Sequence, residues 1–491
     1  MYRKTEDQMI MPHDFFLPFG GTLNKDNRWV KLATIIPWWK VEQMYAKRFE
    51  KRIKGRPAVS VRMALGSLII KERLGTSDRE TVEQIKENPY LQYFIGLSGF
   101  QEEAPFHHSL MTHFRKRLNR KAINQINEWI VIEQQAHEQA QDQDDDHDDA
   151  PPQEMTGDGD TDQTLSESSS NRGKLLLDAT CAPADIAYPT DLSLLNDARE
   201  KLERMIDTLH APFRGKKLKP RTYRWIARRS YLSVAKQKRP GARKVRKAIG
   251  QQLRFIARDL KHVTTLANQN GLDLLSQRQY RQLLVIQELY RQQRDMYVNR
   301  THRTDDRIVS ISQPHVRPIV RGKANTNVEF GAKVSVSLVD GYAMLEELKW
   351  DAYNEANTLQ QAVEAYYERH GCYPEAILAD KIYRNRENLQ YCKKHNIRLS
   401  GPKLGRPPKH EPTDQKRLIK QEAAERNAIE GKFGEGKRSY GLGLIRACLQ
   451  ETSESVIALQ FLVMNLEHRL RLLFYSFFKP FWQQLKPSYA A

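Results

Sequence analysis

Two aspartates that follow short apolar runs, and one glutamate on a helix-like segment, are the residues of this sequence best suited to chemistry. Asp178 follows Leu175–Leu177, Asp380 follows Ile377–Ala379, and Glu430 lies further along the chain. Short apolar runs that end in a carboxylate are typical of buried strands, and open α/β sheets bind ligands beyond strand ends. Mg²⁺ prefers oxygen ligands, and two such ions act on a phosphodiester when shared carboxylates hold them. The three side chains therefore suit two-metal cleavage of a phosphodiester.

Each aspartate also fits a purely structural role. Asp178 can end a strand, and Asp380 can cap the helix that follows it. Asp340 precedes Gly341, a pair well suited to a hairpin turn, so we assign it to structure. Asp191 precedes a helix-like run and is assigned to an N-cap. Residue type alone does not decide between these roles for Asp178 and Asp380.

The elements that must position these residues follow one another in an α/β pattern. The apolar run 174–178 predicts a buried strand, and the alternating apolar residues within 308–344 predict hairpins. Residues 357–370 read as an amphipathic helix, 375–380 as another strand, and 414–440 as a long helix. The order strand, hairpins, helix, strand, helix predicts an α/β domain that carries all three carboxylates.

Two further segments are helical and basic. The segment from Arg28 to Arg120 shows helix-like patterns and ends in a cluster of cations, which predicts a small helical domain. Residues 212–261 hold 18 Lys and Arg and one acid, in sequence that stays helix-like to about residue 297. Tyr223 and Trp225 within it are expected to pack rather than to stack on bases. The residues that we expect to contact DNA phosphates in these segments are Arg115, Arg117, Lys216, Lys217, Arg224, Arg228, Arg229, Lys244, Arg246 and Lys247.

The charge of the chain is strongly uneven. The formal net charge is +19, from 79 Lys and Arg against 60 Asp and Glu. Residues 138–171 hold 12 acids and no base, so the remainder carries 79 − 48 = +31. A positive field of this size attracts polyanions, of which nucleic acid is the commonest. The acidic stretch has few apolar side chains and is expected to be a disordered linker rather than a metal site.

The four cysteines and the length of the apolar runs indicate in which cell compartment the protein is expected. No two cysteines form a Cys-x-x-Cys pair, which argues against both a disulfide framework and a zinc knuckle. The first residues lack a signal-peptide pattern, and no apolar run approaches about 18 residues. We therefore expect reduced thiols, a cytoplasmic location and no membrane association.

Several motifs together resemble a known family. The segments are Leu177–Thr180, Tyr188–Asp191 with Leu194 and Leu195, Leu378–Tyr383, and Arg426–Glu430 leading to Lys437. They are similar to the three acidic motifs of bacterial insertion-sequence DDE transposases. In addition, Gly55-Arg56-Pro57 through Gly96-Leu97 to Phe114–Leu118 resembles the helical N-terminal domain of the same family. The resemblance covers most of the chain.

The resemblance implies a fold and a domain organisation. In this family the catalytic domain is RNase H-like, a mixed five-stranded sheet flanked by helices, with the first Asp on the central strand and the Glu on a helix. By this resemblance, residues 1–137 form a helical DNA-binding and dimerisation domain and 138–171 the linker. Residues 172–476 form the catalytic domain, with a helical basic insertion at about 197–304, and 477–491 a tail.

The third motif, Arg426–Glu430 with Lys437, lies in the long segment that is expected to be helical. Arg426, Glu430 and Lys437 fall on one helical face, so a metal-binding carboxylate and two cations for DNA phosphates would project together. Many relatives carry a Tyr where this chain has Ala423, and Glu435 remains a second choice for the third ligand. Each glycine within 431–436 destabilises a helix by about 1 kcal/mol relative to alanine. This segment must therefore be stabilised by packing against other elements, or the helix loosens after Glu430.

The implied function is DNA transposition. Two Mg²⁺ ions, with Mn²⁺ as a substitute, are expected on Asp178, Asp380 and Glu430, and the partners are the element ends, target DNA and a second copy of the chain. The protein would be nucleoid-associated and would take no small-molecule substrate. Two alternatives remain: an inactive transposase derivative that only binds DNA, and a plain metal-dependent nuclease. A single-strand nuclease with paired histidines is disfavoured, because the adjacent His107 and His108 would point to opposite faces of a strand.

Overall fold

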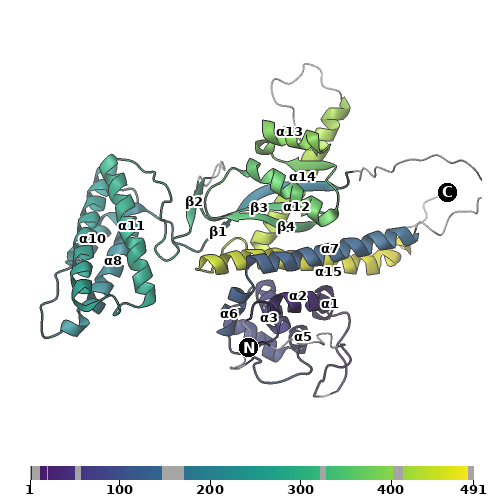
Figure 1. The fold of residues 1–491 in the computed structure, drawn as a ribbon, viewed down its shortest axis with the longest axis horizontal. Helices are drawn as coiled ribbons and strands as arrows, with labels where there is room; N and C mark the ends of the chain where they lie inside the picture. Colours follow the sequence, from purple (N-terminus) through teal and green to yellow (C-terminus); the bar gives the residue numbers. More distant parts are fainter. Residues whose placement is uncertain are drawn as a thin grey trace, which may run out of the picture.

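A mixed sheet of six strands lies at the centre of the computed structural model (Figure 1). The strands are β1 (Lys174–Pro183), β2 (Arg317–Val320), β3 (Val328–Val339), β4 (Tyr342–Lys349), β5 (Ala376–Ala379) and β6 (Arg398–Leu399). Their order is β2-β3-β1-β5-β6, and β4 also pairs with β3. Strands β1, β2 and β4 are antiparallel to β3, whereas β5 is parallel to both β1 and β6. The fold is therefore mixed α/β, as the sequence predicted.

The described part of the chain excludes some of the segments discussed above. The structure describes residues 2, 11–18, 20–49, 57–145, 171–320, 328–401 and 413–484, without the side chains of 133–145 and 475–484. Most of the predicted acidic linker, residues 146–170, lies outside these ranges, as does the Gly55-Arg56 pair. The first residues of that linker belong to a helix that continues to Asp145, and another helix continues to Gln484 within the predicted tail.

The sheet has one strand more than the five that were expected. Gly331 of β3 pairs with Arg317 of β2 on one side and with Pro183 of β1 on the other. Further along β3, β4 continues the edge that β2 begins. Six strands therefore occupy five positions across the sheet. The run 308–311, which was predicted to pair, forms no strand. Its buried Ile308 and Ile311 pack in the helical lobe, whereas Val309 packs in the main apolar cluster.

The β3–β4 hairpin shows how local sequence fixes the register. Val339 pairs with Tyr342, so Asp340 and Gly341 form the two-residue turn. Both have positive φ, 49° and 82°, a conformation that Asp and Gly tolerate. The structural assignment of Asp340 is confirmed. Because the turn has only two residues, it sets the pairing of β4 with β3, which covers the antiparallel edge of the sheet.

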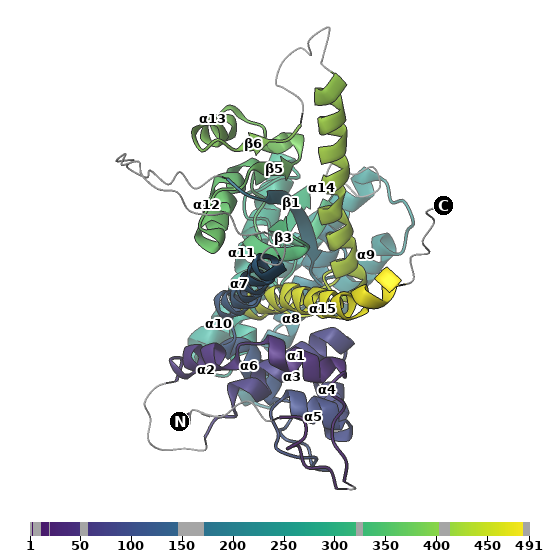
Figure 2. The ribbon, with the colours of Figure 1, turned by 90° about the vertical axis from the view of Figure 1, so that its right-hand side faces the viewer.

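Helices cover both faces of the sheet (Figure 2). Leu175 and Leu177 of β1 pack in one apolar cluster with Leu359 and Val363. Residues alternate between faces along a strand, so Leu176 and Asp178 point to the opposite side. The helical elements after the hairpin are η2 (Glu355–Thr358), α12 (Leu359–His370), η3 (Lys381–Tyr383), α13 (Arg386–Lys394), α14 (Thr413–Ser439) and α15 (Gln450–Gln484). Of these, α12 packs on β1 and β4, and α14 packs on β1 and β5.

The N-terminal helices share their core with the sheet domain. They are α1 (Arg28–Ile35), α2 (Trp38–Ala46), α3 (Val61–Leu74), α4 (Asp78–Glu87), α5 (Pro89–Phe94), α6 (Leu110–Arg117) and α7 (Arg120–Asp145). The hydroxyl of Ser77 caps α4 by accepting from the Glu80 amide. One apolar cluster runs from these helices through α15 to the inner residues of β3. Helix α15 contacts α1, α3, α6, α7 and β4, so it joins the two parts.

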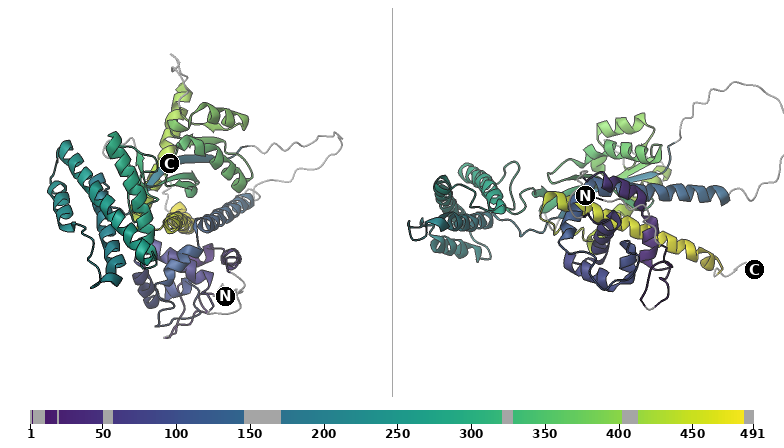
Figure 3. Two further views of the ribbon diagram at one scale, coloured as in Figure 1. Left: turned by 60° about the vertical axis from the view of Figure 1, so that its left-hand side comes forward. Right: turned by 60° about the horizontal axis from the view of Figure 1, so that its bottom comes forward.

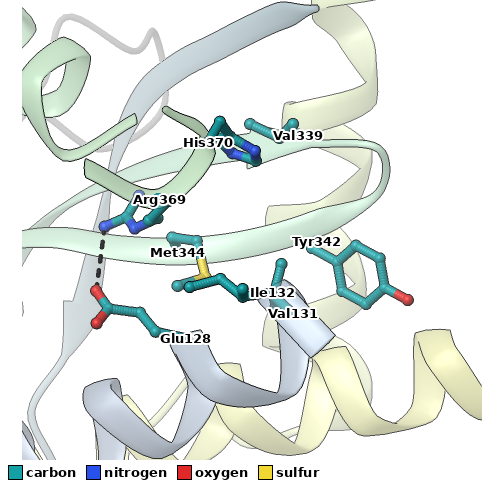
Figure 4. Close-up of a pocket in the computed structure, with 8 residues that line it drawn as sticks. All are labelled: Glu128, Val131, Ile132, Val339, Tyr342, Met344, Arg369 and His370. Atoms are coloured by element: carbon teal, nitrogen blue, oxygen red, sulfur yellow. Dashed lines mark hydrogen bonds and ion pairs between the residues drawn. The ribbon is translucent and has the colours of Figure 1, made fainter. Parts of the chain in front are cut away.

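Helix α7 closes the other side of the junction (Figure 4). Its Glu128 lies 3.4 Å from Arg369 at the end of α12, and Arg369 also donates to Glu346 of β4. Val131 of α7 packs with Tyr342 and Met344 of β4. The pair Glu128–Arg369 thus ties α7 and α12 together across β4. In the described residues, no helix is both long and apolar enough to span a membrane.

A separate helical lobe is inserted between β1 and β2 (Figures 1 and 3). It consists of α8 (Asp191–His210), η1 (Ala211–Phe213), α9 (Arg224–Ala235), α10 (Ala242–Asn270) and α11 (Gln277–Asn299). The lobe has its own apolar core, which includes Leu195, Ile206 and Ile256. Asp191 lies in the first turn of α8 after the cap Thr190, and its carboxylate pairs with Arg307 at 2.6 Å. The structural assignment of Asp191 holds, although the N-cap is its neighbour.

Replacing Asn465 should weaken the junction between α15 and the sheet. Asn465 is fully buried, accepts from the Ala343 amide at 2.9 Å, and donates to the Ala343 carbonyl and to Asn127. Asn465→Ala leaves these buried groups unpaired, so we expect a loss of about 3 kcal/mol in the free energy of unfolding. Denaturant unfolding followed by circular dichroism measures it. Gln450→Ala, at the exposed start of α15, is the control, and equal stability of the two variants would contradict the role of Asn465.

Candidate active site

Asp178 and Asp380 are brought side by side by two neighbouring strands. Leu177 of β1 pairs in parallel with Ala379 of β5, so the next residue on each strand is an aspartate. Strand β5 ends at Ala379, whereas β1 continues to Pro183 as the antiparallel partner of β3. The expectation that Asp178 ends its strand is therefore wrong. It lies mid-strand, at the point where the parallel pairing with β5 stops.

The Asp178 carboxylate is largely buried among other acids. Its side chain is 17% exposed and accepts a hydrogen bond from the Ala179 amide at 2.8 Å. Burial raises its pKa to about 6, and the negative charges of Glu355 and Asp380 act in the same direction. The Ala179 amide and the Arg426 guanidinium oppose the shift. A carboxylate in this position lacks sufficient positive charge around it, a condition that a bound cation relieves.

Asp380 combines a structural role with access to solvent. It is the N-cap of η3, and its Oδ1 accepts from the Lys381 amide at 2.7 Å. The sequence suggested that Asp380 caps the following helix, but it caps η3 instead, and Asn385 is the N-cap of α13. Asp380 is nevertheless exposed, whereas the preceding residues of β5 are buried. Capping fixes the carboxylate at the strand end without removing it from the surface beside Asp178.

Glu430 reaches the two aspartates through an arginine. It lies on α14, and its side chain is 55% exposed. Arg426, one turn earlier, places one nitrogen 3.2 Å from Glu430 and another 3.9 Å from Asp178. Within the ranges that the structure describes, no three His, Cys, Asp or Glu side chains lie close enough to hold one metal ion. The structure thus brings Asp178 next to Asp380 in register and links Asp178 to Glu430 by Arg426.

Helix α14 stays regular through its glycines because other parts pack on it. A Cβ on Gly436 would lie 3.1 Å from the Met464 sulfur and 3.2 Å from a Leu442 methyl group. Glycine therefore permits the close approach of α14 to α15, and the helix continues to Ser439. Glu435 pairs with Lys432 at 3.3 Å and with Arg471 of α15 at 2.9 Å. The second choice for the third ligand is thus held by two cations at the α15 side.

Glu355 is a site residue that the sequence analysis did not single out. It lies in η2 and pairs with Lys333 of β3 at 2.9 Å. Its charge contributes to the raised pKa values of Asp178 and of the buried Tyr383. No motif marks this residue, because it lies in a turn between the hairpin and α12. Only the folding of that turn over the sheet brings it near Asp178.

The lysines and arginines that were predicted to bind DNA divide into two groups. Several are held by neighbouring side chains: Arg115 by Asp78 at 2.6 Å, Arg117 over the Phe49 ring, Arg224 by Asp207 at 2.9 Å, and Arg246 over the Tyr297 ring. Others are exposed on the lobe: Lys216, Lys217, Arg228, Arg229, Lys244 and Lys247. Trp225 is 79% exposed, so the expectation that it packs is wrong. Tyr223 lies under the Arg258 guanidinium, 4.7 Å from the ring centre.

Comparison with known proteins identifies the family. The family described as transposase DDE domain matches residues 377–467, which include Asp380 and Glu430. The family described as transposase domain (DUF772) matches residues 19–117, across the N-terminal helices. The chain belongs to the insertion-sequence DDE transposases. The family resemblance seen in the sequence motifs is therefore confirmed. Members of this family generally use divalent metal ions.

The other comparisons add a relative of unknown function. The transposase is 30% identical over 222 residues to an uncharacterized protein, ORF8 in the nfe locus of Rhizobium meliloti. The aligned part is 45% of this chain and 86% of the relative. No solved structure matches the transposase. The DDE-domain match begins within β5, so Asp178 lies before it and rests on the strand pairing described above.

The inserted lobe of the transposase contains a buried acid with an altered pKa. Asp259 of α10 is fully buried, and in the described structure neither carboxylate oxygen accepts a hydrogen bond. Arg258 is its nearest cation, with Nε 3.7 Å from Oδ1. Burial raises the Asp259 pKa from 3.8 to about 7, and the neighbouring Glu203 adds to this effect. The folded lobe therefore holds a proton on Asp259 that the unfolded chain releases at lower pH.

Asp259→Asn should remove a pH dependence of stability. Because the folded pKa is raised, stability from this group is present below pH 3.8 and falls as pH rises toward about 7. The neutral amide avoids this loss, so at pH 8 the variant should gain up to ~4 kcal/mol, and little at pH 4. Denaturant unfolding at both pH values, with the exposed Asp273→Asn as control, measures the difference. An equal effect at both pH values would contradict the assignment.

Proposed function

We propose that this transposase binds the ends of its element and catalyses metal-dependent DNA cleavage and strand transfer at Asp178, Asp380 and Glu430. The observation that carries the proposal is the register of β1 and β5, which sets Asp178 beside Asp380 on the sheet face covered by α14. Glu430 lies on that helix and is linked to Asp178 by Arg426. The proposal thus draws on one carboxylate within β1, one directly after β5 and one on α14, which a bound metal ion would bring together.

The topology supports an RNase H-like catalytic domain. Three antiparallel strands, β1, β3 and β4, are followed on the other side of β1 by the parallel strands β5 and β6. The first aspartate lies on the central strand, the second follows its neighbour, and the glutamate lies on a covering helix. This is the arrangement that the family resemblance implied. On this proposal the catalytic domain extends from residue 172 to the C-terminal helix, with α8–α11 as the basic insertion.

The donor set fits a pair of divalent ions. The three groups are hard oxygen donors, which suit Mg²⁺ and, as a substitute, Mn²⁺. The raised pKa of Asp178 reflects burial and the neighbouring acids Glu355 and Asp380, a local excess of negative charge. Bound Mg²⁺ would supply activation of the attacking oxygen and stabilisation of the leaving oxygen. Asp178, Asp380 and Glu430 would hold it, in a site where Asp178 is shielded from water.

The remaining side chains orient the DNA. Arg426 lies between Asp178 and Glu430, and its five N–H donors suit a phosphate oxygen when the carboxylates are occupied by metal. Water attack at each element end frees a 3′ hydroxyl, which then attacks a phosphodiester of target DNA. Atoms balance in both steps, because each forms one P–O bond and breaks one. A second copy of the chain would bring the two ends together.

The inserted lobe would contact DNA mainly through its exposed cations. Lys216, Arg228, Arg229 and Lys244 are exposed on a lobe that extends away from the sheet (Figure 3). Each phosphate that such a residue neutralises releases counterions, so binding should fall steeply with salt. The exposed Trp225 adds an aromatic surface beside Arg228. The lobe would therefore hold DNA electrostatically while the carboxylates act on it.

Substituting each carboxylate should abolish cutting without abolishing DNA binding. We expect Asp178→Asn, Asp380→Asn and Glu430→Gln to lower Mg²⁺-dependent cleavage of a linear element end by at least about a hundredfold. Gel assays of cleavage, with DNA affinity measured separately, test this. Glu425→Gln is the matched control, a half-buried acid directly before Arg426 on α14 whose partner is Lys174. If wild type binds DNA but never cuts, the chain is an inactive DNA-binding derivative. If it cuts but never joins ends, it is a plain nuclease.

A further inference from the structure

A groove joins the N-terminal helices to the catalytic domain. It is open, has a volume of about 760 Å³, and lies between α3, α4 and α6 on one side and α14 and α15 on the other. The loop 440–449, which connects α14 to α15, forms part of its wall. Figure 2 shows the end of α14 meeting α15 above the N-terminal helices. The groove lies apart from Asp178, Asp380 and Glu430, none of which lines it.

Cations predominate among the charged residues that line this groove. They are Lys71, Arg115, Lys437 and Arg446, against the two acids Glu72 and Asp78, which leaves a net 4 − 2 = +2. Both acids already have partners inside the groove wall, since Lys71 lies 2.9 Å from Glu72 and Arg115 lies 2.6 Å from Asp78. Arg446 is exposed. The groove therefore presents a positive field in which the acids are largely compensated.

Hydroxyl groups line the same groove between the cations. Thr76, Ser77 and Thr112 come from the N-terminal helices, and Ser439 comes from the end of α14. Hydroxyls and cations together are the groups that proteins use for phosphate and sugar oxygens in DNA. Gly75, with φ of 67°, has nothing within 4 Å of an added Cβ, so the wall is open at that point. The lining thus suits a polar, anionic chain rather than an apolar ligand.

The groove is rigidly connected to the carboxylate site. Lys437 lies on α14, the helix that carries Glu430. In the loop beyond it, the Ile445 amide donates to the Pro183 carbonyl at 2.7 Å, and the Asp185 amide donates to the Ile445 carbonyl at 3.0 Å. Pro183 ends β1, the strand that carries Asp178. One wall of the groove is therefore fixed to both elements that hold the carboxylates.

We propose that this groove binds the sugar-phosphate backbone of one strand of the DNA that enters the active site. The inference rests on the proposed function and extends it. It assigns a composite DNA site to Lys71, Lys437 and Arg446, supplied jointly by the N-terminal domain and the catalytic domain. A DNA duplex is wider than its own major groove, which is already about 12 Å wide. A groove of about 760 Å³ therefore accommodates one sugar-phosphate backbone and not a whole duplex. The two domains thus hold the same strand.

Cys448 offers a direct probe of occupancy. It lines the groove and is exposed, whereas Cys181 and Cys392 are buried and Cys372 is partly buried. In full-length Cys372→Ser protein, a maleimide should therefore react mainly at Cys448. We expect a saturating linear DNA duplex to slow this reaction at least about tenfold, because seated DNA blocks the thiol, whereas polyglutamate should not. Mass spectrometry identifies the modified residue and gives the rate.

A charge variant tests the groove independently of the thiol. Lys71→Ala with Arg446→Ala should lower the slope of log affinity against log salt by about two, one for each lost phosphate contact. The matched control is Lys393→Ala with Lys394→Ala, two exposed lysines of α13 that do not line the groove. Circular dichroism of both double variants verifies that they fold. Because Lys71→Ala removes the partner of the buried Glu72, affinities are measured well below the thermal unfolding midpoint of each variant.

The outcomes separate this proposal from the proposed function. Protection of Cys448 by DNA, with a reduced salt slope in the groove variant only, supports the composite site. If the wild type binds and cuts DNA while Cys448 reacts at an unchanged rate, the groove proposal is overturned and the proposed function stands. The same conclusion follows if both double variants lose affinity equally. If the wild type binds no DNA, both proposals fail together.

Discussion

The parallel pairing of β1 with β5 is the constraint on which the rest of the site depends. Leu177 lies opposite Ala379, and a shift of this register by one residue would move one aspartate to the other face of the sheet. The register is protected because Leu175 and Ile377 belong to one buried apolar cluster under α12. Apolar packing on one face of the sheet therefore fixes the position of carboxylates on the other face. Helix α14 then brings Glu430 and Arg426 to that second face.

Helix α15 makes the N-terminal helices part of the same body as the sheet. It contributes Leu462 and Leu466 to the apolar cluster that also contains Leu65 and Leu68 of α3. Its buried Asn465 makes strand-like hydrogen bonds to Ala343, which satisfies the outer edge of β4. These contacts fix the position of the N-terminal helices relative to Glu430. The walls of the groove between the two parts are therefore fixed relative to each other.

The inserted lobe is stabilised by contacts of its own. It folds around its own apolar core, and it also buries Arg199, Glu203 and Asp259. The ion pair between Arg199 and Glu203 compensates part of this buried charge, whereas the Asp259 carboxylate has no hydrogen bond among the described residues. Burial of ionised groups in a basic lobe costs stability that the apolar core must offset. The surface cations of the lobe remain available for a polyanion.

The sequence by itself determined the elements and the chemical type of the site. Apolar runs and periodicity located β1, β5 and α14, and the Asp340-Gly341 pair fixed the hairpin, because these signals depend on residues close together in the chain. The motifs also identified the family. Only the tertiary structure decided that β1 continues past Asp178, that Glu355 lies near that carboxylate, and that Arg115 and Lys437 line one groove. These facts depend on contacts between residues far apart in sequence, which local patterns do not encode.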